Sequence, residues 1–315
     1  MSPSVTLGRT GVAQYWLLAI VGGIVSTVIY VLAGHGAFGG MLLAYFAPLP
    51  VFAVGLGLGA AAGTISSLVA AVIMLTVGGV VAASVYVLMN AIPVIILLRQ
   101  AMLSRTNEQG DQDWYPSGHL IVAASTIAAV IFTIGAFWFE TASTGLEDTV
   151  RTFVANLVQQ MAPNIPNDQM EPMVQMVSQI LPGFIGASWL IMIVINGALA
   201  QSALVRFGKN LRPSPNLISM EFPQWFLILT AIAAAMAAIL PAALGFFGQN
   251  LMIILIAPFF FMGLAVIHAV CRKRPSSTVL LVTFYAFLTI FGWPAIFVVL
   301  LGLIEQWAGF RQRFA

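Results

Sequence analysis

Charged side chains are scarce in this sequence, and their scarcity decides the class of protein. Only 7% of the 315 residues are Asp, Glu, Lys or Arg, whereas 60% are hydrophobic. A soluble domain carries roughly 25% charged residues. The apolar runs are long enough for helices that cross a bilayer and too long for the strands of a membrane β-barrel. The sequence therefore predicts an all-α, polytopic transmembrane helix bundle with about eight to ten membrane helices, in contact with the lipid bilayer.

Acidic residues are absent from the middle of every apolar run, and Glu305 lies near the end of one. Carriers driven by protons or sodium often place carboxylates at membrane depth, so a carboxylate coupling site is not expected. The HExxH, GxSxG and Walker A motifs are also missing. Their absence argues against the familiar intramembrane hydrolases and against ATP hydrolysis by this chain. We therefore expect no enzyme activity and no cofactor.

Cysteine and histidine are rare as well. The single cysteine, Cys271, cannot form an internal disulfide. It follows His268 by three residues, whereas His35 and His119 are far from both and from each other in the sequence. No metal-ligand spacing arises from them, so no metal site is expected. The net charge is only +2, and the basic residues lie in short loops between apolar runs, so no nucleic-acid partner is expected either.

Residues 41–63 depart from the pattern of a simple membrane helix. Pro48 and Pro50 lie inside an apolar run, and each lacks an N–H, so the carbonyls of Ala44 and Phe46 lose their helical partners. In hydrocarbon such carbonyls need protein, water or a ligand. Many transporters build a site near the membrane midplane from a broken helix. A kinked packing helix that binds nothing explains the same pattern, and both interpretations stay open.

A second broken helix is expected near Asn90, because Pro93 frees a carbonyl almost beside that side chain. Two further polar residues lie in the apolar run at 184–205, where such residues either bond a neighbouring helix or contact a ligand. The candidate substrate-binding residues are Tyr45, Pro48, Pro50, Asn90, Asn196 and Gln201. We expect them to line a cavity that opens on the external side of the membrane.

Small residues predict close helix contacts in the first two helices. Ala19 and Gly23 are four residues apart, as are Gly55 and Gly59, and this spacing places each pair on one helix face. Such faces serve packing within the bundle or docking to a partner membrane protein.

The long polar segment at 140–181 carries five acidic residues and one basic residue, Arg151. Its apolar residues recur at helical spacing, so it predicts an amphipathic helical hairpin that is either a passive cover or a gating lid. Near the end of the chain, Gly292-Trp293-Pro294 interrupts an apolar run. It predicts a C-terminal hairpin at 278–309, with a single long helix as the alternative. We expect one membrane domain over residues 1–315 that includes both features.

The basic residues of the loops fall on one side of the membrane if the helices alternate, and the acidic segment falls on the other. These basic residues are Arg9, Arg99, Arg105, Arg206, Lys209, Arg212, Arg272, Lys273 and Arg274. Positive loops face the cytoplasm. We therefore expect both termini in the cytoplasm.

Two stretches carry a family resemblance. APLPVFAVGLGLGAAAG, which follows a glycine-containing first helix, and GLIEQW with FRQR near the C-terminus resemble the YybS-like family of bacterial integral membrane proteins, a domain of unknown function. That family is similar in its N-terminal helices to the substrate-binding S components of energy-coupling-factor (ECF) vitamin transporters. The resemblance implies a bound small-molecule substrate and an ATP-driven membrane partner. This chain departs from an S component by having more apolar segments. The alternative function is a non-catalytic membrane scaffold or assembly protein.

Overall fold

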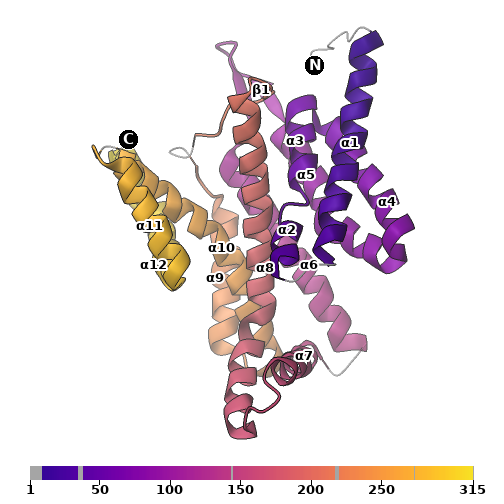
Figure 1. Ribbon diagram of the computed structural model, residues 1–315. Coiled ribbons are helices and arrows are strands. Elements are labelled where there is room, and N and C mark those ends of the chain that lie inside the picture. Colours follow the sequence, from indigo (N-terminus) through magenta and orange to yellow (C-terminus); the bar gives the residue numbers. More distant parts are fainter. Residues whose placement is uncertain (1–8, 35–37, 143–144, 217–219, 273, 315) are drawn as a thin grey trace. The chain divides into compact units, whose positions relative to one another are not determined.

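Helices make up nearly all of the secondary structure in the computed structural model, which describes residues 9–34, 38–142, 145–216, 220–272 and 274–314 (Figure 1). In chain order the elements are α1 (Arg9–Gly34), α2 (Phe38–Ala44), α3 (Leu49–Leu58), α4 (Ala60–Tyr86), η1 (Val87–Ala91), α5 (Ile92–Ala101), β1 (Ser104–Thr106), β2 (Gln112–Trp114), α6 (Ser117–Ala142), α7 (Leu146–Met161), α8 (Asn167–Arg206), α9 (Gln224–Ile239), α10 (Ala242–Arg272), α11 (Ser277–Phe291), α12 (Pro294–Ala308) and α13 (Phe310–Phe314). The all-α helix bundle predicted from composition is confirmed.

The number of membrane spans is lower than the eight to ten expected. Within the described residues, five helices are long and apolar enough to cross a membrane, or up to six if the bent α11–α12 pair is one span. Two shorter apolar helices, Leu42–Leu58 and Gln224–Ile239, do not reach that length. The expected number included these short helices and counted the residues on either side of Gly79 as two spans, whereas the count of five takes Ala60–Ala101, which is kinked at Gly79, as one.

The chain divides into two compact units. Unit 1 contains Met1–Leu120 and Met192–Pro215, and unit 2 contains Ile121–Ile191 and Asn216–Ala315. Helices α6 and α8 each contribute one part to unit 1 and the other part to unit 2. The expectation of a single membrane domain stays a prediction.

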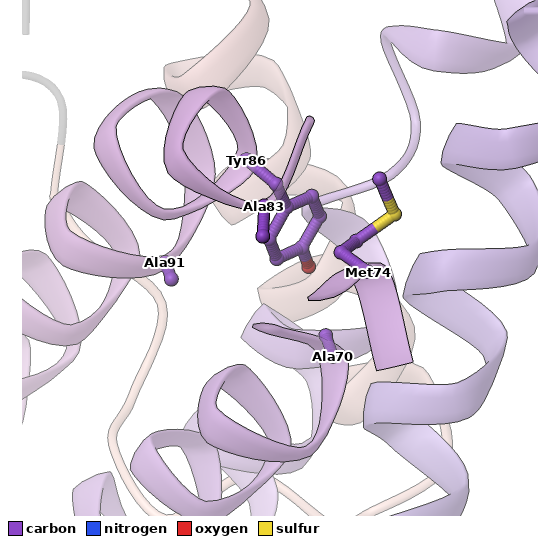
Figure 2. Close-up of a cluster of buried hydrophobic side chains, with 5 residues drawn as sticks. All are labelled: Ala70, Met74, Ala83, Tyr86 and Ala91. Carbon is purple, nitrogen blue, oxygen red and sulfur yellow. The ribbon is translucent and has the colours of Figure 1, made fainter. Parts of the chain in front are cut away.

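Within unit 1, α4 folds back on itself at Gly79. The backbone of this residue has φ 74°, a conformation that glycine adopts without steric cost. Ala70 and Tyr86 belong to one buried cluster (Figure 2), although a continuous helix would hold them about 24 Å apart. The chain on either side of Gly79 therefore packs together.

A two-stranded antiparallel ribbon occupies the polar loop between α5 and α6. Arg105 of β1 lies opposite Asp113 of β2 in its register, and their side chains form an exposed ion pair at 3.8 Å. The prediction for this loop named no secondary structure. With three residues in each strand, the ribbon leaves the all-α class unchanged.

In unit 2, α8 runs without interruption through Pro182, so the end of the segment at 140–181 and the apolar run at 184–205 share one helix. A side chain of α10 supplies hydrogen bonds that the helix lacks beside this proline. Gly183 N donates to Asn250 Oδ1 at 2.7 Å, and Asn250 Nδ2 donates to the Gln179 carbonyl at 2.9 Å. The amide group thus bridges the two backbone groups that an uninterrupted helix would join directly.

Helix α7 and the first turns of α8 form the helical hairpin expected from the segment at 140–181. Val154 and Val158 of α7 are buried with Val174 of α8. Arg151 and Glu171 join the same two helices through an exposed ion pair. The hairpin thus has an apolar interior and a polar exterior, while its position outside the cell stays a prediction.

The C-terminal run consists of two helices, α11 and α12, whose axes are bent by 120°. This bend confirms the hairpin at 278–309 and excludes the single long helix. Helix α12 packs closely on α10, where a Cβ added to Gly302 would lie 1.8 Å from the Phe259 carbonyl oxygen. The boundary between α9 and α10 lies at residues 240–241.

Candidate functional site

All six candidate substrate-binding residues belong to unit 1. The unwound turn between α2 and α3 holds Tyr45 and Pro48, and Pro50 lies in the first turn of α3. The two prolines leave carbonyls without helical partners, and neighbouring peptide groups bond these carbonyls instead. The Ala44 carbonyl accepts a bond from Ala47 N, and the Phe46 carbonyl accepts one from Leu49 N, both at 3.1 Å. These tight turns satisfy the backbone locally.

Asn196 of α8 reaches the same turn. Its Nδ2 donates to the Tyr45 carbonyl at 2.6 Å and to the Met192 carbonyl at 2.8 Å. Because these two bonds occupy the amide nitrogen, Oδ1 points elsewhere, and it is buried without a hydrogen-bond partner. The Asn196 side chain is 1% exposed, whereas Tyr45 is 43% exposed. The structure therefore places one buried, unpaired acceptor beside the proline break.

Ser26 of α1 fixes the turn from another direction. Its Oγ donates to the Ala47 carbonyl at 2.6 Å and lies 2.6 Å from the Tyr86 hydroxyl. Since Ser26 has one proton and gives it to Ala47, the Tyr86 hydroxyl donates to Ser26. This chain of bonds ties the α2–α3 turn to α1 and to the folded-back part of α4.

Asn90 lies in η1, a single π-helical turn in which Ile92 N donates to the Val87 carbonyl. The broken helix expected next to Pro93 is present in this form, and such turns are frequent at functional sites. Asn90 is 5% exposed. It is not among the hydrogen-bond partners of Asn196.

The small residues singled out from the sequence have two different environments. A Cβ added to Gly23 would lie 2.4 Å from the Ser66 carbonyl oxygen, and Ser66 Oγ donates to the Ala19 carbonyl at 2.5 Å. A Cβ on Gly55 would lie 2.3 Å from a leucine side chain of α5. Gly59 instead separates α3 from α4 with φ 105°, and its added Cβ would meet nothing within 4 Å. Glycine is needed there for its backbone conformation.

Gln201 lies in a second polar region, where it meets a residue that the sequence analysis read only as a loop arginine. Its Nε2 donates to the Arg212 carbonyl at 2.8 Å. Arg212 is 5% exposed, and its guanidinium group donates to the carbonyls of Ala101 at 3.0 Å and Tyr115 at 3.1 Å. No sequence signal marks this burial, because Arg212 follows other basic residues in a Pro- and Asn-rich loop.

Burial governs the electrostatics of Arg212. Loss of solvent around the guanidinium group lowers the pKa of Arg212 from its ordinary value, although an arginine remains protonated in proteins. The guanidinium carbon lies 5.9 Å from the centre of the Trp114 ring, within the range of a cation–π contact. The region therefore contains a buried positive charge, which backbone carbonyls and an aromatic ring stabilise in part.

Neither polar region contains the groups of a familiar catalytic or metal centre. Among the described residues, no three side chains of the His, Cys, Asp or Glu type come close enough to hold a metal ion. The first region offers an unpaired hydrogen-bond acceptor, the amide oxygen of Asn196. The second region offers the Arg212 cation and an unpaired acceptor, the amide oxygen of Gln201. Such groups can bind and orient a ligand.

Comparison with known proteins places this architecture in a family. A family model described as predicted membrane protein (DUF2232) matches residues 24–305, which is most of the chain. The chain belongs to this family. The match includes both broken helices and the C-terminal hairpin, and it is consistent with the YybS-like resemblance of the sequence. No curated protein and no solved structure matches the chain.

Two findings identify this chain as an integral membrane protein of unknown function: it belongs to the DUF2232 family, and its structure contains several apolar helices long enough to span a membrane. Large apolar side chains are exposed along its spanning helices, among them Leu17 of α1 and Val72 of α4. Lipid contacts such surfaces in a membrane protein, because the apolar faces of the spans lie within the hydrocarbon.

Proposed function

We propose that this chain is the substrate-binding subunit of a small-molecule transporter in the bacterial inner membrane and has no catalytic activity of its own. The supporting observation is the Oδ1 atom of Asn196, which is buried without a partner beside the unwound α2–α3 turn. An unpaired buried acceptor costs about 1–3 kcal/mol. A substrate that donates a hydrogen bond would remove this cost, and the free energy gained would contribute to binding.

The energy source in this proposal is an ATP-driven membrane partner. The sequence has no acidic residue in the middle of an apolar run and no Walker A motif, so neither ion coupling by a carboxylate nor ATP hydrolysis is expected of this chain. The similarity of the YybS-like family to ECF S components supports a subunit that another protein energises. This likeness is an analogy between families, and function must be tested at the site itself.

In this proposal both termini are cytoplasmic, and the α7–α8 hairpin lies outside. The charge asymmetry of the loops supports this orientation. The hairpin carries Glu147, Asp148, Asp168 and Glu171 against the single cation Arg151. The cavity expected between Tyr45, the proline break, Asn90 and Asn196 stays a prediction.

A membrane scaffold or assembly protein is the second candidate, and one observation favours it. The carbonyls of Ala44, Tyr45, Phe46 and Ala47 all accept hydrogen bonds from protein groups. The proline break therefore leaves no backbone acceptor of this turn for a ligand. If Asn196 serves only to close the turn, its role is to hold α8 against α2 and α3.

Mass spectrometry of small molecules retained by gently purified protein separates the two candidates. We expect a molecule that copurifies with the native protein, raises its melting temperature when added back, and is lost from Asn196→Leu. Asn156→Leu changes an exposed asparagine of α7 and serves as the matched control, which should retain the molecule.

Asn196→Leu also removes two hydrogen bonds, so Asn90→Leu provides a second variant that should fold and bind the molecule more weakly. A stable protein complex that copurifies without any small-molecule effect would favour the scaffold. Retention of the same molecule by both site variants at native levels would contradict the proposed site.

A further inference from the structure

The region around Arg212 has properties that the proposed substrate site does not use. It lies in unit 1, where the last turn of α5, the segment before α6 and the loop after α8 come together. Arg212 joins all three segments through its bonds to Ala101 and Tyr115 and through the bond from Gln201 to its own carbonyl.

The positive charge of Arg212 has no acidic partner in this unit. The three carboxylates of unit 1 are Glu108, Asp111 and Asp113, and they lie in the exposed ribbon loop. Asp113 pairs with Arg105, and no ion pair joins any of the three to Arg212 among the described residues. A buried charge is costly unless it is paired, and carbonyl dipoles compensate only part of it. An anion would complete the site.

The unpaired atoms of this region set the chemistry of that anion. Arg212 Nε is a donor, and it is buried without a partner. Gln201 Oε1 is also buried and unpaired, and it must act as an acceptor because Gln201 Nε2 already donates to the Arg212 carbonyl. A single ligand that satisfies both atoms needs an anionic oxygen for the guanidinium group and a hydrogen-bond donor, such as a hydroxyl group, for the amide.

The position along the helices indicates the depth in the membrane. Both α5 and the helix that leads into it belong to the spanning segment Ala60–Ala101, and α6 begins its span at Ser117. Arg212 contacts residues at these ends, beside Trp114, a residue type enriched at the membrane–water interface. Phospholipid headgroups occupy that level, and basic pockets at helix ends bind anionic headgroups.

We propose that the Arg212–Gln201 region binds a hydroxyl-bearing phosphate ester of the phosphoglycerol type. The same chemistry could come from the headgroup of phosphatidylglycerol or from a soluble glycerol phosphate. The proposal does not rest on the transport function, since none of its groups touches the α2–α3 turn and a scaffold protein would use the site equally well.

The test measures the melting temperature of detergent-purified protein with three separate probes: dihexanoyl phosphatidylglycerol, dihexanoyl phosphatidylcholine and glycerol 3-phosphate. We expect phosphatidylglycerol to raise the melting temperature of the native protein in a saturable way and phosphatidylcholine to leave it unchanged. An equal effect of glycerol 3-phosphate at similar concentration would identify a soluble ligand instead of the lipid, with the site itself supported. No effect of either phosphoglycerol probe on the native protein would overturn the proposal.

Variants separate a binding role from a purely structural one. Loss of a charge-assisted bond in Arg212→Gln should raise the half-saturating probe concentration by about tenfold or more. Gln201→Met retains the Arg212 cation and should raise the half-saturating probe concentration by a smaller factor. If Arg212→Gln does not fold, Gln201→Met alone tests whether the site binds the probe. Arg206→Gln removes an exposed cation from the end of α8 and should match the native protein. Unchanged probe affinity in Gln201→Met, and in Arg212→Gln where it folds, would show that Arg212 only clamps backbone carbonyls.

Discussion

Asn250 replaces a backbone hydrogen bond of α8 at Gly183. Its Oδ1 accepts from the Gly183 N–H at 2.7 Å, while its Nδ2 donates to the Gln179 carbonyl at 2.9 Å, and its side chain is fully buried. Pro182 would otherwise break the helix at this position, because proline disrupts the preceding turn. A single amide from α10 thus keeps a 40-residue helix continuous.

Substitution of this amide should therefore weaken α8. Asn250→Leu leaves the buried Gly183 N–H without a partner, at a cost of about 1–3 kcal/mol, and also removes the bond to the Gln179 carbonyl. We expect a lower melting temperature and new proteolytic cleavage near residue 182. Asn156→Leu on the surface of α7 is the control, and equal melting temperatures for the two variants would contradict this role of Asn250.

Close contact between α1 and α4 predicts that Gly23 cannot be enlarged. A Cβ at this position would lie 2.4 Å from the Ser66 carbonyl oxygen, which is backbone and cannot rotate away. Overpacking costs about 1–3 kcal/mol or more, so Gly23→Leu should lower the yield and melting temperature of the protein. Gly135→Leu on α6 is the control, because nothing lies within 4 Å of its added Cβ. The interpretation fails if both variants behave like the native protein.

The buried ion pair between Glu305 and Arg311 should contribute far more to stability than the exposed pair of the α7–α8 hairpin. Glu305 Oε1 accepts from Arg311 Nε at 2.9 Å, and the two side chains are 1% and 5% exposed. Removing one partner of a buried pair costs about 3–5 kcal/mol. Glu305→Gln should therefore lower the melting temperature strongly, whereas Glu171→Gln in the exposed pair should cost at most about 1 kcal/mol.

The measurement is thermal unfolding of both variants in the same detergent. Arg311 also donates to the Met220 carbonyl, so loss of Glu305 should loosen the contact between the C-terminus and the segment before α9. Similar melting temperatures for Glu305→Gln and Glu171→Gln would show that burial does not strengthen this pair.

The orientation of the protein in the membrane can be tested by labelling single cysteines. In a protein with Cys271→Ala, a cysteine at exposed Asn156 should react with an impermeant thiol reagent added to intact cells, and a cysteine at exposed Ser214 should not. The positive loops motivate this expectation. Both cysteines should react once the membrane is permeabilised. The reverse pattern in intact cells would place both termini outside.

Local chemistry explains why several features could be predicted from sequence. A proline removes a donor wherever it occurs, so Pro48 and Pro50 mark a break regardless of what surrounds them. Gly79 and Gly292 likewise interrupt helices through their own backbone conformations. The apolar runs identify the membrane class, because the bilayer demands about 20 apolar residues per helix.

Distant contacts explain the rest. Pro182 had the same local signal as Pro48, yet its helix continues because Asn250 lies beside it in space. Arg212 had the local signal of a solvated loop residue, yet carbonyls of two other segments enclose it. The sequence placed Asn196 and Gln201 in one candidate site. In the structure Asn196 bonds Tyr45 and Gln201 bonds Arg212, so the two side chains belong to different regions.

The length of α8 gives the protein a natural attachment point. Forty helical residues extend about 60 Å along the helix, roughly twice the thickness of the hydrocarbon layer. With the apolar run at 184–205 inside the bilayer, the polar first turns of this helix would extend beyond the lipid tails, with residues 162–166 joining them to α7. A small folded protein inserted in that connection would sit in water on a stiff stem. It would provide the fiducial mass that electron microscopy of a 33.6-kDa membrane protein requires.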